Sequence, residues 1–199
     1  MNAGPFRHAP GVLDTKQIQR LQALSEFYTP ERLQTLLVPM ITQKDELSLR
    51  VLDWLVTNYA KKYNVVYEYE PHPGKRLLIN VYNEYKAWLR NYRRKNFDPF
   101  RRRERITFTT ADGTEETTVG QLNFVYWAYK YGVLTYTRTH LRTIEQDMNQ
   151  SLGNVKRQKE ADKRNGRKRK RQELSQLPPT QCVVYRADLV TGFDSDEAE

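Results

Sequence analysis

The chain has 199 residues, which is room for one domain of about 100–150 residues with tails, and aromatic residues make up 12% of it, which excludes a wholly disordered protein. Its 33 Lys and Arg against 24 Asp and Glu give a formal net charge of +9, which favours an acidic partner. No apolar run reaches the ~18 residues of a membrane span, and the first ten residues lack the apolar core of a secretory signal, so we expect a soluble, intracellular protein with no membrane partner.

The N-terminal third of the sequence predicts an arm followed by short helices. Residues 1–14 show little hydrophobic periodicity, so we expect a flexible arm there, with the ordered domain beginning near Thr15. Leucines at helical spacing then lie on both sides of Thr29-Pro30. Thr29 suits a helix cap and Pro30 suits the first position of a helix, so the pattern predicts two short helices that meet here.

The middle of the sequence begins with its clearest helix and then changes period. Apolar residues from Leu47 onward follow one face at 3.6-residue spacing, which places Trp54 in the core, and Asp45 is positioned to cap this helix. Val65–Tyr69 instead alternates in type, which predicts a strand ended by the Pro and Gly residues of positions 71–74.

A helix and a hairpin are expected next. Aromatic and apolar residues at helical spacing predict a helix over residues 80–95, which the Asp98-Pro99 pair would separate from the hairpin. Ile106–Val119 has the pattern of a β-hairpin that turns at Asp112-Gly113. The chain then returns to helical patterning.

Two further helices close the predicted domain. Thr118 and Gln121 have the spacing of a capping box, and the helix that they open ends where Gly132 suits a position just past a helix. Val133–Leu152 predicts another helix, ended by Gly153. A helix-turn-helix arrangement around Gly132 is an alternative, but the first of these helices is aromatic on several faces, which favours a core helix.

These elements predict the fold class and the domain organisation. We expect one mainly helical α+β domain over residues 15–153, with a small antiparallel sheet that joins Val65–Tyr69, the hairpin and a short strand at Val183–Tyr185. Residues 154–181 are expected to be a basic, largely disordered linker, and residues 182–199 to hold that short strand and an acidic tail.

Positive charge is concentrated in two blocks, of which the first lies inside the predicted domain. Lys86–Arg105 holds nine basic and two acidic residues, interleaved with aromatic side chains. The guanidinium fork suits phosphate, and aromatic rings stack on bases. The candidate nucleic-acid-binding residues are Arg90, Tyr92, Arg93, Arg94, Lys95, Arg101, Arg102, Arg103 and Arg105. The alternative is that the aromatic rings face the core and the arginines form a solvated helix face.

The second block, Lys156–Arg171, holds ten basic and two acidic residues. Two basic clusters separated by ten residues have the spacing of a bipartite nuclear-import signal, and a disordered basic run also binds nucleic acid by counterion release. The residues of the import-like pattern are Lys156, Arg157, Lys168, Arg169, Lys170 and Arg171. A plain flexible linker is the competing interpretation.

Signatures of enzymes, metals and cofactors are largely missing from the sequence. It has no phosphate-binding glycine loop, no nucleophile elbow and no zinc-protease motif, and its lone Cys182 forms no internal disulfide or zinc cluster. Glu84-Tyr85-Lys86, with Glu68 or Glu70 upstream, has a minor likeness to a metal-dependent nuclease pattern. We therefore expect no enzymatic activity, no catalytic residue, no metal and no cofactor.

Three stretches together resemble a known viral family. They are LSLRVLDWLVTNYAKKYNV, FDPFRRRERI and TTVGQLNFVYWAYKYGVLTY, followed by KRKRQELS. In order, they resemble the immediate-early proteins of iridoviruses, a family with relatives in other nucleocytoplasmic large DNA viruses. The residues that fall in its recurrent motifs are Trp54, Asp98, Pro99, Phe100, Arg101, Gln121, Leu122, Asn123 and Trp127. The resemblance implies a viral protein made early in infection and supplies no active site.

Charge and resemblance together predict a non-enzymatic viral factor that binds nucleic acid, DNA rather than RNA, through the phosphate backbone. The alternative is a structural or scaffold protein of the virion or viral factory that binds acidic viral proteins. The expected location is the host nucleus or a cytoplasmic viral factory, or the virion itself. The sequence leaves the oligomeric state open.

Overall fold

The computed structural model describes residues 4–164, which form a mainly helical α+β domain, as predicted. Helices dominate the chain order, and two of them contain π-helical turns, η1 and η2. The elements are β1 (Phe6–Arg7), α1 (Thr15–Phe27), α2 (Pro30–Arg32), η1 (Leu33–Leu37), α3 (Val38–Ile41), α4 (Leu49–Trp54), η2 (Leu55–Tyr59), α5 (Ala60–Tyr63), β2 (Val66–His72), β3 (Lys75–Asn80), α6 (Val81–Tyr92), the 3-10 turn η3 (Arg94–Asn96), β4 (Arg105–Thr110), β5 (Gly113–Thr118), α7 (Val119–Lys130), α8 (Val133–Thr139) and α9 (Leu141–Arg164).

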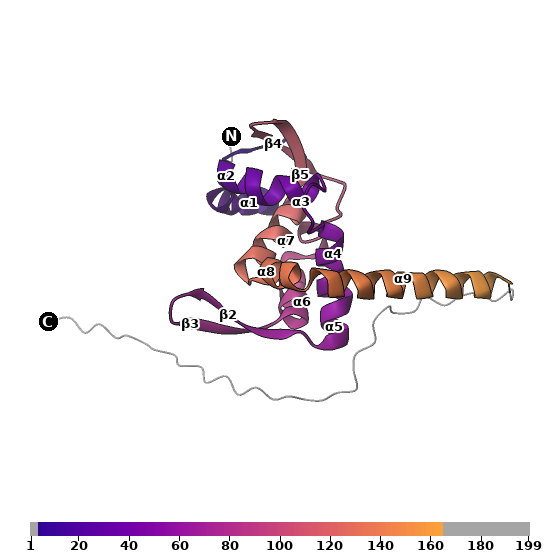
Figure 1. The fold of residues 1–199 in the computed structure, drawn as a ribbon. Helices are drawn as coiled ribbons and strands as arrows, with labels where there is room; N and C mark the ends of the chain where they lie inside the picture. Colours follow the sequence, from indigo (N-terminus) through magenta and orange to yellow (C-terminus); the bar gives the residue numbers. More distant parts are fainter. Residues whose placement is uncertain (1–3, 165–199) are drawn as a thin grey trace.

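Helix α7 runs through the middle of the molecule. On one side of it lie the sheet β1-β4-β5 and helices α1 to α3, and on the other lie α4 to α6 and the hairpin β2-β3 (Figure 1). Eight of its twelve residues are buried, among them Leu122, Phe124 and Trp127. This burial confirms that α7 is a core helix, as its aromatic residues on several faces predicted.

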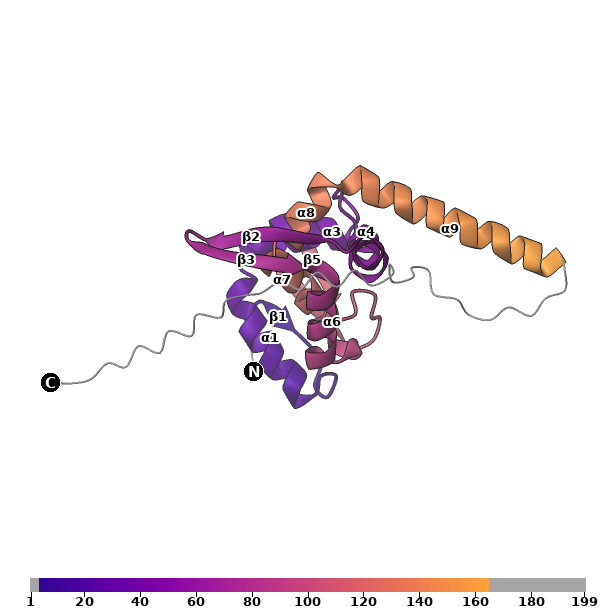
Figure 2. The ribbon, with the colours of Figure 1, turned by 90° about the horizontal axis from the view of Figure 1, so that it is seen from below.

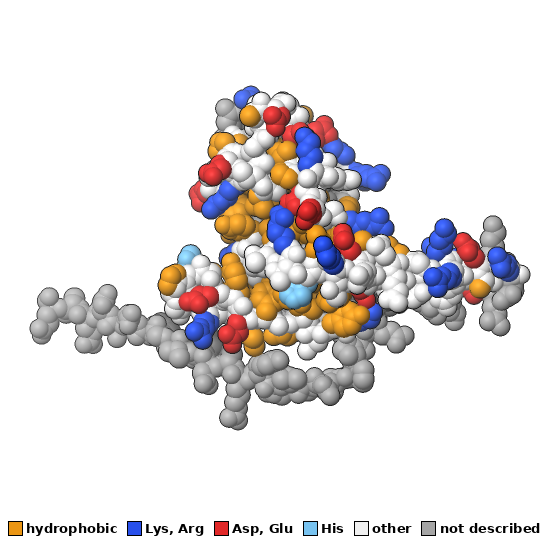
Figure 3. Space-filling view, viewed as in Figure 1, with side chains coloured by type: hydrophobic (Ala, Val, Ile, Leu, Met, Phe, Trp, Pro, Cys, Tyr) orange, Lys and Arg blue, Asp and Glu red, His pale blue; other side chains and the backbone are white. Residues whose placement is uncertain are grey.

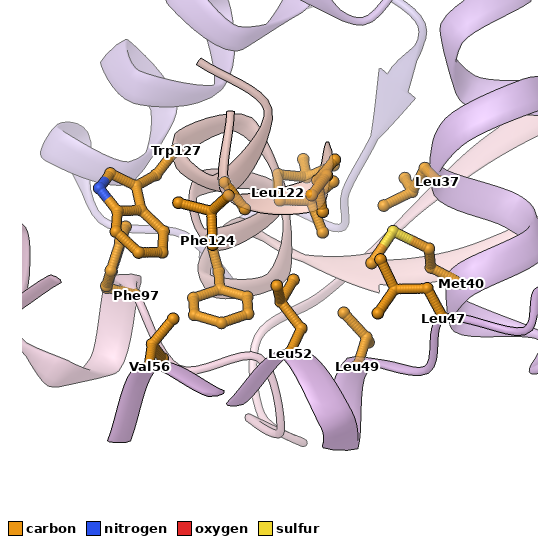
Figure 4. Close-up of a cluster of buried hydrophobic side chains, with 14 of the residues drawn as sticks. Leu37, Met40, Leu47, Leu49, Leu52, Val56, Phe97, Leu122, Phe124 and Trp127 are labelled. Atoms are coloured by element: carbon orange, nitrogen blue, oxygen red, sulfur yellow. The ribbon is translucent and has the colours of Figure 1, made fainter. Parts of the chain in front are cut away.

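Around α7 the core is continuous. Figure 4 shows Leu37, Met40 and Leu47 at one end of the cluster and Phe97 and Trp127 at the other, with Leu52 and Phe124 between them. Each fully buried side chain of this size contributes about 1.5–3 kcal/mol through removal from water. Trp54 is also buried, as predicted from its place on the apolar face of its helix.

The predicted flexible arm is wrong for its apolar part. Phe6 is only 2% exposed, packs edge-on against Tyr28 and Phe108, and pairs with β4 as the outer strand of the sheet. Asp14 and Gln17 then form a capping box that opens α1. A single Phe among Gly and Pro has no periodicity, so sequence patterning misses a two-residue strand whose stability comes from β4.

The sheet architecture also differs from the prediction. The hairpin β4-β5 is confirmed, but β2 pairs with β3 in a separate two-stranded sheet. Leu77–Asn80 belongs to β3, so the predicted helix over 80–95 begins at Val81, capped by Asn80, and ends at Tyr92. Gly74, at φ +83°, makes the turn between β2 and β3. The expected strand at Val183–Tyr185 lies outside the described residues.

The capping interactions of two helices also differ from the prediction. Ser48, not Asp45, caps α4 by accepting a hydrogen bond from the Val51 amide. Asp45 instead binds the guanidinium of Arg138 through two hydrogen bonds of 2.6 and 2.9 Å. Thr118 caps α7 as predicted, but Gln121 accepts a hydrogen bond from the Thr117 hydroxyl and does not complete the capping box.

The last helix extends beyond the predicted end of the domain. The expected helix over 133–152 is divided at His140 into α8 and α9, and α9 continues through Gly153 to Arg164. Figure 2 shows α9 projecting from the body. The first part of the basic segment is therefore helical, which corrects the expectation of a linker that is largely disordered from residue 154.

Candidate nucleic-acid interface

The segment between α6 and β4, residues 93–104, carries most of the predicted basic residues of the first block. It leaves α6 at Arg93, whose backbone has φ +61° and ψ 148°. This region is almost exclusive to glycine, and occupying it costs about 1–3 kcal/mol. The surrounding contacts therefore stabilise this turn, because the backbone of Arg93 does not favour this conformation by itself.

A buried polar network fixes this loop against α1 and α7. The Gln17 amide donates to Asn96 Oδ1 at 3.0 Å, and the Asn123 amide donates to the Asn96 carbonyl at 2.9 Å. A Cβ on Gly120 would lie 2.7 Å from the carbonyl oxygen of Asp98. Glycine at this position thus allows the loop to lie directly on α7.

Three of the predicted phosphate-binding residues are engaged in ion pairs. Lys95 binds Asp14 at 2.7 Å, and the Arg101 guanidinium binds Glu104 at 3.0 Å. Arg105 binds Glu116 across the hairpin at 2.7 Å. These carboxylates compete with phosphate for their basic partners, so the contribution of the three residues to binding an acidic partner is reduced.

The remaining five arginines of the block are exposed, and none of them forms an ion pair with any described residue. They are Arg90, Arg93, Arg94, Arg102 and Arg103. Arg90 lies near the end of α6 and the others lie in the loop that follows it. Figure 3 shows Lys and Arg side chains gathered along the right-hand edge of the body, at the level of β5 and the adjoining loop.

The aromatic residues of the block divide between core and surface. The Tyr92 ring stacks on Trp88 at 5.0 Å, and the Arg20 guanidinium lies 4.6 Å from its centroid, so Tyr92 is not an open platform for a base. Phe97 is fully buried. Phe100, at 50% exposure, is the ring that the fold presents to solvent beside the arginines.

Between the loop, α6 and the π-helical turn η2 lies a groove of about 310 Å³, which we call the Asp53 groove. Its lining residues are Asp53, Thr57, Tyr85, Leu89, Arg94, Asp98, Pro99 and Phe100. A second hollow of about 240 Å³ shares Thr57, Tyr85, Leu89 and Arg94 with it and adds Asn58, Lys61, Tyr82 and Lys86. Both hollows open among the basic residues of the first block.

Asp53 is the residue that sequence analysis missed. Burial raises the pKa of its carboxyl to about 6, with the negative charge of Asp98 acting in the same direction and Arg94 opposing the shift. Within residues 4–164 this carboxylate has no hydrogen bond and no ion pair, although the Thr57 hydroxyl donates to the Asp53 main-chain carbonyl. A carboxylate that lines a groove, has a raised pKa and has no hydrogen-bond partner among the described residues marks a candidate binding site.

Another hollow, of about 450 Å³, lies over β5 and is a weaker candidate. Threonines and glutamates of β5 line much of it. Its two arginines, Arg101 and Arg105, are the ones already paired with Glu104 and Glu116.

Comparison with known proteins places the chain in a family. The model of the family of unknown function DUF7197 matches residues 12–189. The chain belongs to this family.

One relative of this DUF7197 protein is an uncharacterised protein of Acanthamoeba polyphaga mimivirus, a nucleocytoplasmic large DNA virus. The two are 34% identical over 152 residues, which cover 73% of this chain and 58% of the mimivirus protein. The chain thus spans less than two thirds of its viral relative. No solved structure matches it. The comparisons thus confirm a relative in a nucleocytoplasmic large DNA virus.

The minor nuclease pattern gains no support from the structure of this DUF7197 protein. Glu84 and Lys86 are two positions apart in α6 and so point about 200° apart around the helix. Glu70 accepts a hydrogen bond from the Gly74 amide at the tip of the hairpin β2-β3. Among the described residues, no group of three or more His, Cys, Asp or Glu has an arrangement that would hold a metal ion.

The import-like residues fall partly on α9. Lys156 and Arg157 are exposed on this helix, whereas Lys168–Arg171 lie outside the described residues. No helix between residues 4 and 164 combines the length and the apolar content needed to cross a membrane.

Proposed function

We propose that this DUF7197 protein is a non-enzymatic viral factor, made early in infection like the iridovirus immediate-early proteins that it resembles. In this proposal it binds nucleic acid, DNA in preference to RNA, with the five exposed arginines around the Asp53 groove contacting phosphates. One observation carries the proposal: Arg90, Arg93, Arg94, Arg102 and Arg103 are exposed and form no ion pair within the described part of the chain, although acidic residues lie nearby in sequence.

The arrangement of these arginines supports phosphate binding. Arg94 lines the groove, Arg90 follows the groove residue Leu89 in α6, and Arg102 and Arg103 come shortly after the groove residue Phe100 in the loop. A guanidinium without a carboxylate partner keeps its fork of donors available for a phosphate. A nucleic-acid backbone at the groove would therefore meet Arg94 in it and further arginines in the two segments that form its walls.

A second basic surface lies on the projecting end of α9 (Figure 2). Lys156, Arg157, Lys159 and Arg164 are exposed on the projecting end of the helix. We assign to them, and to Lys168–Arg171, a supporting role in backbone binding and in nuclear import. The expected location is then the host nucleus or the viral factory.

The experiment is fluorescence anisotropy with the full chain and labelled duplex and single-stranded DNA, and with RNA of the same sequence. We expect Arg102→Gln/Arg103→Gln to weaken DNA binding by about tenfold to a hundredfold, because two backbone contacts are lost. The matched control is Lys75→Gln/Arg76→Gln, which removes the same charge at the exposed tip of the hairpin β2-β3. Equal weakening by both double variants would show that only net charge matters and would contradict a site at the loop.

A scaffold role in the virion or viral factory is the second candidate, and the projection of α9 favours it (Figure 2). A helix that extends from the body has an exposed surface for an acidic viral protein. Quantitative mass spectrometry of purified particles distinguishes the two roles. A copy number comparable to that of capsid components supports the scaffold, and absence from particles supports the nucleic-acid factor.

A further inference from the structure

The Asp53 groove has a chemical composition that phosphate binding alone does not explain. Asp53 lines it with a carboxylate that has no hydrogen bond or ion pair within residues 4–164. A carboxylate offers about four acceptor positions on two oxygens, and no donor of the described residues occupies those of Asp53. A guest that brings hydrogen-bond donors would satisfy Asp53, whereas a phosphate would be repelled by it.

The walls of the groove suit a flat, partly apolar guest. Tyr85, Leu89, Pro99 and Phe100 line it beside Asp53. Its volume of about 310 Å³ lies at the lower end of the range of small-ligand pockets, about 300–1,000 Å³. Phe100 is half exposed at this site, and aromatic side chains in nucleic-acid-binding proteins stack on unpaired bases with little regard to sequence.

The charged residues around the groove further restrict the chemical class of ligand that fits it. In the groove itself two carboxylates, Asp53 and Asp98, lie with one cationic side chain, Arg94, and further arginines of the first block lie in the segments that continue from its walls. A neutral group with donors along one edge, attached to an anionic backbone, matches both the carboxylate inside and the arginines outside.

We infer that the Asp53 groove binds an unpaired nucleobase of a single strand, and that Asp53 selects guanine. The inference rests on the proposed nucleic-acid binding and specifies which base the groove recognises. Guanine presents its N1 hydrogen and its 2-amino group side by side, and both can donate to the two oxygens of one carboxylate. Adenine and cytosine present one amino group on that edge, and thymine presents one ring hydrogen.

The same recognition requires a single-stranded nucleic acid. In a duplex the N1 and 2-amino groups of guanine are turned toward the partner base, so a side chain can reach this edge only when the base is unpaired and splayed out. The groove would receive such a base while Arg90, Arg102 and Arg103 hold the flanking phosphates. Base selection and backbone binding would then depend on different residues.

The test measures anisotropy of the full chain with thymine oligonucleotides that carry one central guanine, inosine or thymine. Inosine keeps the N1 hydrogen and lacks the 2-amino group. We expect the guanine oligonucleotide to bind at least about tenfold more tightly than the other two, as a bidentate base contact does. Asp53→Asn should reduce this ratio to about one, because asparagine offers only one acceptor oxygen to the two donors. The matched control, Glu68→Gln on the exposed face of β2, should leave the ratio unchanged.

Each result has a distinct meaning. Equal affinity of the unaltered chain for the three oligonucleotides would overturn guanine selection while leaving backbone binding in place. No binding to any oligonucleotide would overturn the proposed function itself. A guanine preference that survives in Asp53→Asn would overturn the role of Asp53, and circular dichroism of this variant verifies that it is folded. Phe100→Ala provides a second variant, which should weaken binding of all three oligonucleotides together by loss of stacking.

Discussion

At the scale of single residues, the ionised form of Asp53 opposes the stability of the fold. Its pKa of about 6, compared with an ordinary value near 3.8, means that the folded protein disfavours the charged form. The stability associated with this carboxyl is therefore fully present below pH 3.8 and is lost as the pH rises through 6. A group of this kind gives the fold no advantage at neutral pH.

We therefore expect Asp53→Asn to stabilise the protein at neutral pH. Asparagine cannot ionise, so at pH 7.5 the free energy of unfolding should rise by about 2–3 kcal/mol, the equivalent of the shift in pKa. Below pH 4, where both side chains are neutral, the two proteins should unfold alike. Urea unfolding at pH 7.5 and pH 3.5 measures this difference. A stability gain of equal size at both pH values would show that the charge of Asp53 is not its cause.

The sequence gives little sign of Asp53, in contrast to the arginines. Asp53 lies beside Trp54 in a helix whose apolar face was correctly predicted, and an acidic residue next to such a face is typical of a solvated position. Its burial depends on the loop that carries Asp98 and Phe100, which is distant in sequence. The exposed arginines could be predicted because they form a dense run in the sequence. Which basic residues of this run form ion pairs could not be predicted, because the acidic partners are brought beside them only by the fold.

At the scale of elements, α9 is attached to the body by a polar contact at its inner end. Asp147 accepts hydrogen bonds from the Trp54 indole at 3.0 Å, from the Tyr63 hydroxyl at 3.0 Å and from the Lys62 ammonium. Burial raises the pKa of Asp147, but the hydrogen bonds from Lys62, Trp54 and Tyr63 outweigh it and hold the pKa below its ordinary value. The ionised form is thus the one that joins α9 to α4 and α5.

Asp147→Ala should destabilise the protein by about 1–3 kcal/mol, because the buried Trp54 indole loses its acceptor and Lys62 loses its partner. Glu145→Ala on the same helix is the control and should change the stability by less than about 0.5 kcal/mol. Thermal unfolding at pH 7 measures both. The contribution of Asp147 is present above its ordinary pKa and should disappear as the pH falls through its lowered folded-state value. Equal effects of the two variants would contradict the role of Asp147 as the link.

Elements with a strong local signal could be predicted, and those that depend on partners could not. The hairpin β4-β5, the cap at Thr118 and the end of α7 at Gly132 each follow from two or three adjacent residues. Strand β3 was missed because its apolar residues run directly into α6. Helix α9 extends past Gly153, and the spacing of Lys156, Glu160 and Arg164 at four-residue intervals could have indicated this, because opposite charges at i and i+4 support a helix.

At the scale of the whole molecule, α7 is the central helix against which many of the described elements pack. The β1-β4-β5 sheet, α1, the loop that carries the arginines and α8 all contact it. The arginine loop is joined to α7 by Asn123 and by the close approach at Gly120, so the proposed interface belongs to the core architecture rather than to an appended segment. The fold class could be predicted from the sequence, but the central place of α7 depends on packing from every side.

The proposed function assigns backbone binding to the folded body and gives the basic tail a supporting role. The most direct test is the salt dependence of single-stranded DNA binding between about 50 and 200 mM salt. The body variant replaces Arg90, Arg93, Arg102 and Arg103 by Gln, and the tail variant replaces Lys168–Arg171 by Gln; each removes four charges from the full chain. If the body binds the backbone, its variant should reduce the slope of log affinity against log salt by about 3, at about 0.7 for each lost phosphate contact, and reduce it more than the tail variant does. An unchanged slope in the body variant, with the loss confined to the tail variant, would contradict the account.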